Sequence, residues 1–184
     1  MRRLLFALGI AALAACHKSE PQTNASAPGA EIPVKGVDRT HKGKAAPDVA
    51  FNDPDGHSVT LAKFRGSPVL LNLWASWCAP CVKELPTLDK LAQSQRVRVL
   101  AISQDDGPHA SVVAFLDKLN ARHLGSYQDP QMAWSGALGP DTVLPTTILY
   151  DSNGKEVWRY VGGLDWTSPE AATLISEAKP GGSA

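Results

Sequence analysis

Cys78 and Cys81 stand where an apolar run of strand length meets a helical pattern, and this junction constrains the fold more than any other stretch of the chain. The run Val69–Trp74 is continuous rather than alternating, which is typical of a central strand covered on both faces. After the cysteines, apolar residues recur every three positions from Val82 to Leu91, which indicates a helix. A C-x-x-C pair at such a junction can hold a metal ion, close a short loop or exchange electrons.

Strand and helix patterns alternate around this junction. The predicted elements are, in chain order, a hairpin over 51–61, strands 69–74 and 98–103 with a helix over 79–95 between them, helices over 107–123 and 131–138, a hairpin of strands 146–150 and 156–161, and a helix over 169–178. Ser168 is the expected N-cap of the last helix, and Pro86 is expected to kink the first.

Strands joined by helices pair in parallel, and the second hairpin adds antiparallel neighbours. The prediction is therefore an α/β fold of three layers, with a mixed central β-sheet, helices on both faces and an N-terminal β-hairpin extension. Cys78 falls at the carboxyl end of a central strand, where open α/β sheets bind ligands.

The first sixteen residues form an export signal in this interpretation. Arg2 and Arg3 precede the apolar run Leu4–Ala15, which is too short for a typical membrane span. The letters LAAC, ending at Cys16, resemble the bacterial lipoprotein cleavage box, so we expect residues 1–16 to be a lipoprotein signal peptide that ends at a lipid-bearing Cys16. An ordinary signal peptide with an incidental cysteine is the alternative.

Residues 17–45 are rich in Pro, Ala, Ser, Thr, Gly and charge and lack periodic apolar positions, which predicts a flexible linker. One domain is expected over 46–180, and we expect it to be a monomer. Lys+Arg and Asp+Glu balance at 18 each without a basic cluster, which argues against a nucleic-acid partner.

Cysteine usage narrows the role of the pair. If Cys16 carries lipid, Cys78 and Cys81 are what remains of the three cysteines, so an exported domain has one pair and no leftover thiol. No second cysteine pair or closely spaced histidine pair completes a zinc site. A disulfide that closes so short a loop removes little conformational entropy from the unfolded chain, so a purely structural disulfide would add little stability. Redox exchange is favoured, with no metal and no cofactor beyond the Cys78–Cys81 disulfide.

Several separated motifs form an ordered set between about Pro47 and Ala178. They are WASWCAPC, the Glu84 and Pro86 that follow it, AISQDD, LPTTILYDSNG and GLDWTSPE. The set resembles the thioredoxin superfamily, and within it the exported TlpA/ResA-like thiol:disulfide oxidoreductases. The resemblance implies a thioredoxin-like fold, a cis-proline at Pro145 that faces the disulfide, and a Leu144 backbone that binds the substrate strand.

The expected chemistry begins at Cys78. In the first turn of a helix its sulfur would face unpaired N–H groups and the positive end of the helix dipole, both of which favour the thiolate that attacks a disulfide. Cys81, one turn further, would resolve the mixed disulfide. Trp77, Ala79 and Pro80 flank the sulfurs and are expected to contact substrate or tune the potential, with plain packing as the alternative for Trp77.

Resolution of the mixed disulfide requires a base that takes the proton from the Cys81 thiol. Thioredoxin itself carries a buried acid on the strand six residues before its first cysteine, but that position here is Asn72. Glu84 lies three residues after Cys81 on the same helix, and the exported relatives carry a functional Glu at this place. We expect Glu84 to be the acid/base for Cys81, with its pKa raised if it is buried. An exposed glutamate paired with Lys83 or Lys90 is the alternative.

The leading hypothesis is an oxidoreductase of the bacterial cell envelope, lipid-anchored on the extracytoplasmic side and working mainly as a disulfide reductase. The resemblance implies electrons from a membrane thiol relay and protein substrates such as apocytochrome c or copper-centre assembly factors. A thiol peroxidase is an alternative, because GHSVTLAKFRGSPVLLNLW also resembles the peroxiredoxins. A copper-binding assembly module that uses Cys78 and Cys81 is another, although Met132 is isolated and no histidine is near.

Overall fold

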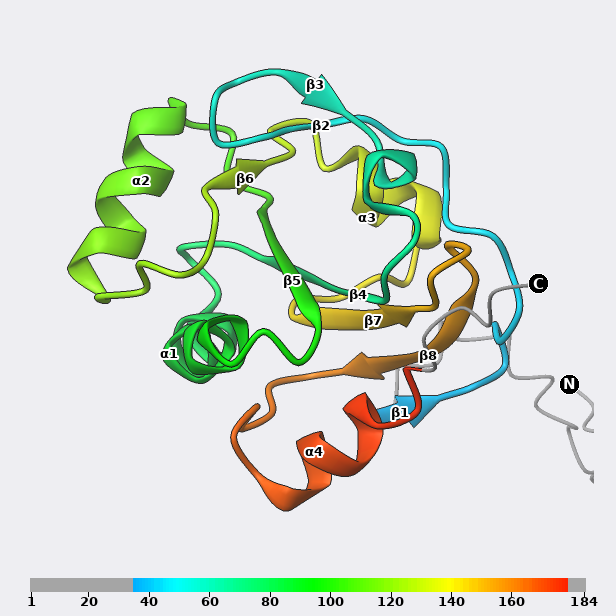
Figure 1. The fold of residues 1–184 in the computed structure, drawn as a ribbon. Coiled ribbons are helices and arrows are strands. Elements are labelled where there is room, and N and C mark those ends of the chain that lie inside the picture. Colours follow the sequence, from blue (N-terminus) through cyan, green and yellow to red (C-terminus); the bar gives the residue numbers. More distant parts are fainter. Residues whose placement is uncertain (1–34, 179–184) are drawn as a thin grey trace, which may run out of the picture. The chain divides into compact units, whose positions relative to one another are not determined.

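An eight-stranded mixed sheet lies at the centre of the computed structural model, which describes residues 35–178 (Figure 1). The predicted signal peptide, Cys16 and the linker up to residue 34 lie outside the described residues. In chain order the strands are β1 Gly36–Asp38, β2 Phe51–Asn52, β3 Ser58–Val59, β4 Val69–Trp74, β5 Arg98–Ser103, β6 Tyr127–Gln128, β7 Thr146–Tyr150 and β8 Glu156–Val161. Their order across the sheet is β1-β8-β7-β4-β5-β6-β2-β3.

The predicted mixture of strand directions is present. β4 pairs in parallel with β5 and β5 with β6, whereas β7 runs antiparallel between β4 and β8. The predicted N-terminal hairpin forms as β2 and β3, and Asn52 pairs with Gln128 of β6, so this hairpin extends the main sheet.

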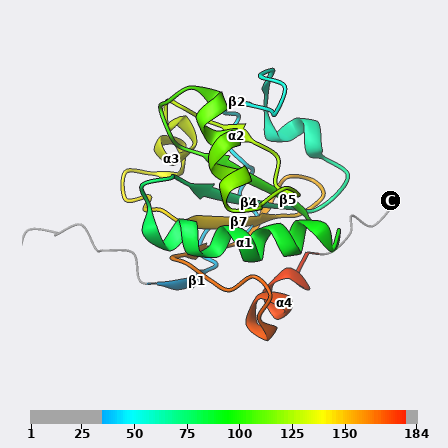
Figure 2. The same ribbon diagram turned by 90° about the vertical axis from the view of Figure 1, so that its left-hand side faces the viewer.

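Helices cover both faces of the sheet. They are the 3-10 turn η1 Leu61–Phe64 and the α-helices α1 Ala79–Gln93, α2 His109–Lys118, α3 Ala133–Leu138 and α4 Pro169–Ile175. Residues of α1, α2 and α4 share one buried apolar cluster, and η1 and α3 contribute to another. Figure 2 shows α1 and α2 in front of β4 and β5. Ser168 caps α4 as predicted, because its side chain accepts a hydrogen bond from the Ala171 N–H.

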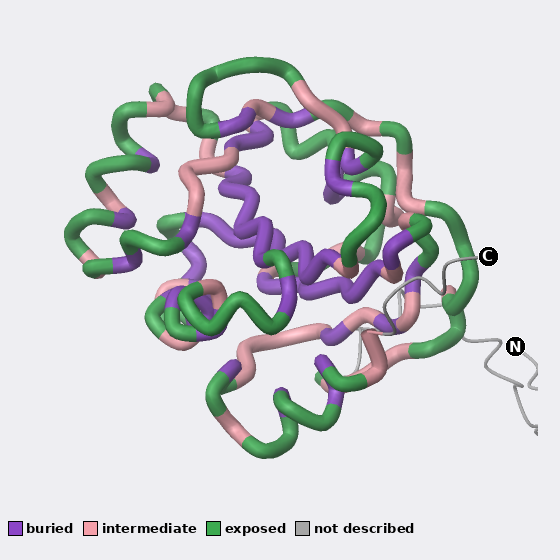
Figure 3. The backbone as a smooth tube through the Cα atoms, in the orientation of Figure 1, coloured by how far each residue is buried: buried purple, intermediate pink, exposed green. Residues whose placement is uncertain are grey.

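The position of β4 explains why five of its six residues are apolar, Asn72 being the exception. Leu70 and Trp74 belong to the cluster under α1, whereas Leu71 and Leu73 belong to the cluster on the opposite face. Figure 3 shows the whole strand as buried. With β5 on one side and β7 on the other, β4 is a central strand whose carboxyl end leads directly into Cys78.

The domain begins earlier than the sequence predicts. Gly36–Asp38 forms β1, which pairs antiparallel with β8 at the sheet edge, and Ala45 forms a bridge with Lys155. The prediction that 17–45 is all linker is therefore wrong from about residue 36 onward. Three strand residues are too few for the alternation that identifies a strand, and the partner lies more than a hundred residues away in the chain.

No helix within residues 35–178 has both the length and the apolar character needed to cross a membrane. α1 runs without interruption from Ala79 to Gln93 across Pro86, and the kink expected at that residue stays a prediction.

Candidate active site

A disulfide joins Cys78 and Cys81 at the start of α1. Cys78 is the N-cap residue, and its sulfur accepts a hydrogen bond from the Cys81 N–H over 3.3 Å. Cys78 is 7% exposed and Cys81 is fully buried. The same donor and the positive end of the helix would stabilise a Cys78 thiolate after reduction, and Cys78 is the sulfur that a substrate reaches first.

A hydrogen-bonded turn holds the residues that precede Cys78. The Asp105 carboxylate accepts hydrogen bonds from the Ser76 N–H over 3.1 Å and from the Ser76 hydroxyl over 2.8 Å. Trp77, the next residue, is 65% exposed. Its exposure contradicts the alternative that Trp77 is a plain packing residue, and its indole is available for contact with a partner.

Ala79 and Pro80 form the first two positions of α1 and are both exposed. A proline fits this first turn because its missing N–H has no helical partner in any case. The two residues leave the outer side of the disulfide open to an approaching chain.

The Leu144–Pro145 peptide bond is cis, as the resemblance implies. Leu73 of β4 pairs with Thr146, which follows Pro145, so the proline lies beside the end of β4 that leads to Cys78. The carbonyl of Pro145 accepts a hydrogen bond from the Gly162 N–H over 2.9 Å, and Leu144 is half-buried. The bend at Pro145 is thus attached to both neighbouring strands.

Glu84 is buried inside the domain, with only 3% of its surface exposed, so the alternative of an exposed glutamate is wrong. Its Oε1 accepts a hydrogen bond from Asn72 Nδ2 over 2.7 Å, and its Oε2 accepts from the Leu164 N–H over 3.1 Å and from Trp166 Nε1 over 3.2 Å. Burial raises the pKa of Glu84 to about 7, although the three donors oppose that rise. The carboxyl group can therefore take up and release a proton near neutral pH.

Asn72 occupies the strand position where thioredoxin has its acid, and here it supports the helix carboxylate. Its amide donates to both Glu84 and the Thr147 hydroxyl, the latter over 2.9 Å. Leu164 and Trp166 are site residues that the sequence analysis missed. The only signal was GLDWTSPE among the motifs of the resemblance, without any indication of which atoms it supplies.

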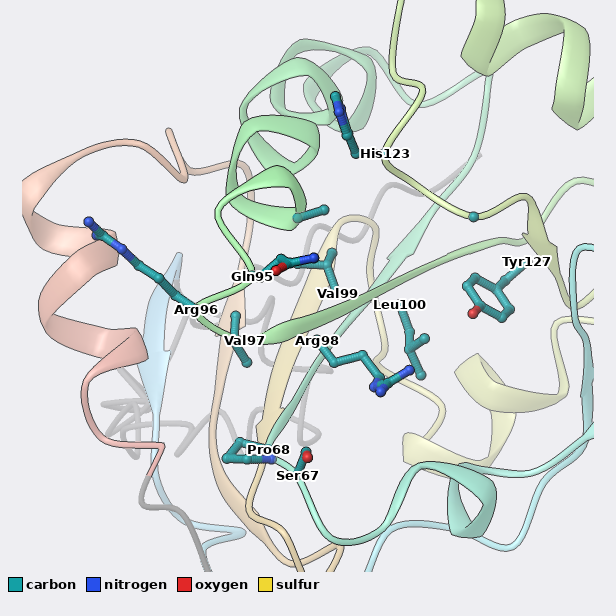
Figure 4. Close-up of a pocket in the computed structure, with 12 residues that line it drawn as sticks. Ser67, Pro68, Gln95, Arg96, Val97, Arg98, Val99, Leu100, His123 and Tyr127 are labelled. Carbon is teal, nitrogen blue, oxygen red and sulfur yellow. The ribbon is translucent and has the colours of Figure 1, made fainter.

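A groove of about 380 Å³ lies beside Pro80 and Glu84 of α1. It is lined by Lys35, Pro80, Lys83, Glu84, Thr87, Gly163, Leu164 and Asp165. A larger hollow of about 500 Å³ lies where β4 and β5 begin, at the opposite end of β4 from Cys78, and Figure 4 shows Arg98, His123 and Tyr127 around it. That hollow contains none of the predicted site residues, whereas two of them, Pro80 and Glu84, line the smaller groove.

Three potential metal ligands converge in the turn between β2 and β3, namely Asp53, Asp55 and His57. The Asp53 carboxylate is already engaged by Lys63 Nζ over 3.0 Å and by the His57 N–H over 2.9 Å. These bonds show that the three residues belong to a turn stabilised by an ion pair. The cluster includes neither cysteine of the disulfide.

Comparison with known proteins places these features in a family. The Redoxin family model matches residues 41–175. The thiol-disulfide oxidoreductase ResA of Geobacillus kaustophilus is 34% identical over 142 residues, which cover 75% of this chain and 78% of that protein. ResA of Geobacillus thermodenitrificans is 34% identical over 117 residues, which cover 61% of this chain and 65% of the relative, slightly less than two thirds of its length.

Solved structures agree with the sequence relatives. A crystal structure described as a DsbE-type thiol:disulfide interchange protein of Chlorobium tepidum superposes with a TM-score of 0.64 at 27% identity, covering 75% of this chain and 98% of that one. The predicted thioredoxin-like α/β fold is thereby confirmed. The chain belongs to the Redoxin family and, within the thioredoxin superfamily, to the TlpA/ResA-like thiol-disulfide oxidoreductases.

Proposed function

We propose that the protein is a membrane-tethered thiol:disulfide oxidoreductase of the cell envelope that works mainly as a disulfide reductase. One observation carries the proposal. The cysteine pair stands at the start of α1 with Cys78 as the outer sulfur, and on the same helix a buried Glu84 has a pKa of about 7. An outer nucleophile, an inner resolving thiol and a neutral-range base are the parts that dithiol exchange requires.

The first step joins substrate to enzyme. The Cys78 thiolate attacks one sulfur of the substrate disulfide, so that a Cys78–substrate disulfide forms and the substrate S–S bond breaks. The departing substrate sulfur leaves as a thiolate and takes a proton from solvent. The exposed Trp77 and the Leu144 backbone would hold the substrate chain across the disulfide during this step.

The second step releases the product. Glu84, as carboxylate, accepts the proton of the Cys81 thiol, and the resulting thiolate attacks Cys78 Sγ. The Cys78–Cys81 disulfide forms, the mixed disulfide breaks, and the second substrate sulfur leaves and is protonated. Two electrons pass from the cysteine pair to the substrate, and Glu84 then returns its proton to solvent.

Catalysis requires re-reduction of the pair. In an oxidising compartment the cysteines would otherwise stay disulfide-bonded, so we assign the electron supply to a membrane thiol relay. The protein substrates in this proposal are apocytochrome c or copper-centre assembly factors. A lipid on Cys16 would hold the domain on the extracytoplasmic side of the membrane, close to that relay.

The test uses the chain from residue 17 onward and compares insulin disulfide reduction, peroxide turnover and copper retention, together with the reduction potential. We expect insulin reduction that Cys78→Ser abolishes. Full reductase activity in the Cys78→Ser variant would refute the assignment, and efficient peroxide turnover or retained copper would instead support the peroxidase or the copper module.

Glu84 is tested by separating the two chemical steps in stopped-flow measurements. Glu84→Gln keeps the size and a hydrogen-bond acceptor but cannot accept the Cys81 proton. We expect slower resolution of the mixed disulfide with little change in its formation. Equal slowing of both steps would contradict the acid/base role.

A further inference from the structure

The groove beside the disulfide is formed by two segments that are distant in the chain. Pro80 and Glu84 of α1 form one wall, and the Gly163–Asp165 segment after β8 forms the other. Pro80 is two residues from Cys78 in the first turn of α1, so the groove begins close to the cysteine pair. The groove is therefore placed to contact residues that neighbour the substrate cysteine.

Two successive glycines keep the groove open. Gly162 has a φ of +95°, which side chains rarely adopt, and a Cβ there would stand 3.0 Å from Cγ of Lys35. A Cβ on Gly163 would stand 3.4 Å from the Pro80 carbonyl oxygen and 3.9 Å from Glu84 Oε2. A side chain at position 162 would be strained and would press on Lys35, and one at position 163 would occupy groove space beside Pro80 and Glu84.

Two lysines supply the charge of the groove. Lys35, just before β1, and Lys83 of α1 both line it and are both exposed, and neither forms an ion pair with another residue of the described range 35–178. Two acidic groups also line the groove. Asp165 is engaged by the N–H and the hydroxyl of Thr167, and Glu84 is held by buried donors. The exposed charges of the groove are therefore two ammonium groups, on Lys35 and Lys83, and one carboxylate, on Asp165, which leaves an excess of one positive charge.

We propose that this groove binds an acidic segment of the protein substrate next to the cysteine that joins Cys78. The proposal rests on the proposed function and adds a substrate class to it. Carboxylate side chains of the partner would lie between Lys35 and Lys83 while its sulfur is attached to Cys78. Pairing of opposite charges at such a rim chiefly speeds encounter and selects partners. β1 then has a role in recognition, since it holds Lys35 at the groove.

The test measures the second-order rate constant at which the reduced protein, in a single turnover, reduces each of three cyclic disulfide peptides. The peptides differ only in the residue after each cysteine, which is Glu, Gln or Lys. We expect the Glu peptide to be reduced about tenfold more efficiently than the Lys peptide at low ionic strength, given the modest strength of exposed ion pairs. The preference should shrink in 0.5 M salt to about twofold or less, because exposed charges are screened.

Variants locate the effect. Lys83→Glu and Lys35→Glu should each lower the ratio of Glu-peptide to Lys-peptide rates several-fold, and Asp165→Asn should raise it. Lys118→Glu is the control, because Lys118 is also an exposed helix lysine but lies on α2 and does not line the groove. This control variant should keep the wild-type ratio.

The possible failures are distinguishable. If all three peptides are reduced at the same rate, or if Lys118→Glu changes the ratio as much as Lys83→Glu, the acidic-segment proposal is overturned while the oxidoreductase activity stands. If the wild-type protein reduces none of the peptides and no insulin either, the proposed function fails and the groove assignment fails with it.

Discussion

At the scale of single residues, the buried carboxyl group of the candidate site comes from the helix residue Glu84 and not from a strand. The strand position carries Asn72, whose amide donates a hydrogen bond to the helix carboxylate. Leu164 and Trp166, from the segment after β8, supply the other donors. The sequence identified Glu84 and the absence of a strand acid, but it could not identify donors about 80 residues away, because no local pattern records which distant N–H groups meet a buried carboxyl.

The raised pKa of Glu84 makes stability depend on pH in a defined direction. Its value rises from 4.5 to about 7 on folding, so the folded protein keeps a proton that the unfolded chain has released between these values. The protonated Glu84 contributes fully to the free energy of unfolding below about pH 4.5, and this contribution is lost as the pH rises through about 7. The total loss is up to about 3 kcal/mol. This pH-dependent part of the free energy of unfolding is measured by urea unfolding between about pH 4.5 and 7. The disulfide-bonded protein is compared with its Glu84→Gln variant. A constant difference between the two proteins would contradict the buried titration.

Asn72→Asp places a second carboxyl group at the 2.7 Å contact with Glu84. Two carboxylates cannot both ionise freely at that distance, so the pair should share a proton and titrate in two separated steps. We expect a loss of roughly 2 kcal/mol or more of unfolding free energy at pH 8 and a smaller loss at pH 5. NMR titration of the two carboxyl groups tests whether they share a proton, and Asn72→Ser is the uncharged control. Two independent pKa values near 4 would refute the coupling.

At the scale of elements, what could be predicted depended on whether the signal was local. The β4–α1 junction and the β7–β8 hairpin follow from short-range patterns, namely the apolar run Val69–Trp74 and the Asn153-Gly154 turn. The edge strand β1 could not be predicted, because its three residues are held by β8 and by packing of Val37 on the core. The same long-range pairing brings Lys35 to the groove, which explains why Lys35 was absent from the predicted site.

A chain that starts at residue 46 should be less stable than one that starts at residue 35. The shorter chain loses the pairing of Gly36–Asp38 with β8, the burial of Val37, the bridge of Ala45 with Lys155 and the backbone hydrogen bonds of residues 43 and 44 with Glu156. We expect the unfolding free energy to fall by about 2 kcal/mol, from partial burial of one apolar side chain and a few strand hydrogen bonds. Urea midpoints of the two chains measure the loss, and Val37→Ser in the longer chain should reproduce part of it. Equal midpoints would show that β1 contributes nothing.

At the scale of the whole molecule, the proposed function requires a lipid on Cys16 that attaches the redox domain to the membrane. Cys16 lies outside the described residues, so its role is open to direct test. Cys16→Ala should move the protein from the membrane fraction to the soluble envelope fraction without changing insulin reduction in solution, because the disulfide site is intact. Mass spectrometry of the N-terminal peptide tests for the lipid. A variant that stays with the membranes would rule out anchoring through Cys16.

The positions of the tryptophans allow the reaction to be followed by fluorescence. Trp77 is 65% exposed and adjoins the disulfide, whereas Trp74, Trp134, Trp158 and Trp166 are buried. A disulfide quenches the emission of a neighbouring indole, so opening of the cysteine pair should brighten the red-shifted fluorescence of Trp77. Trp166 donates to Glu84, and its blue-shifted emission should respond to the proton on that carboxyl. We therefore expect Trp77 to report on the disulfide and Trp166 to report on the proton of Glu84.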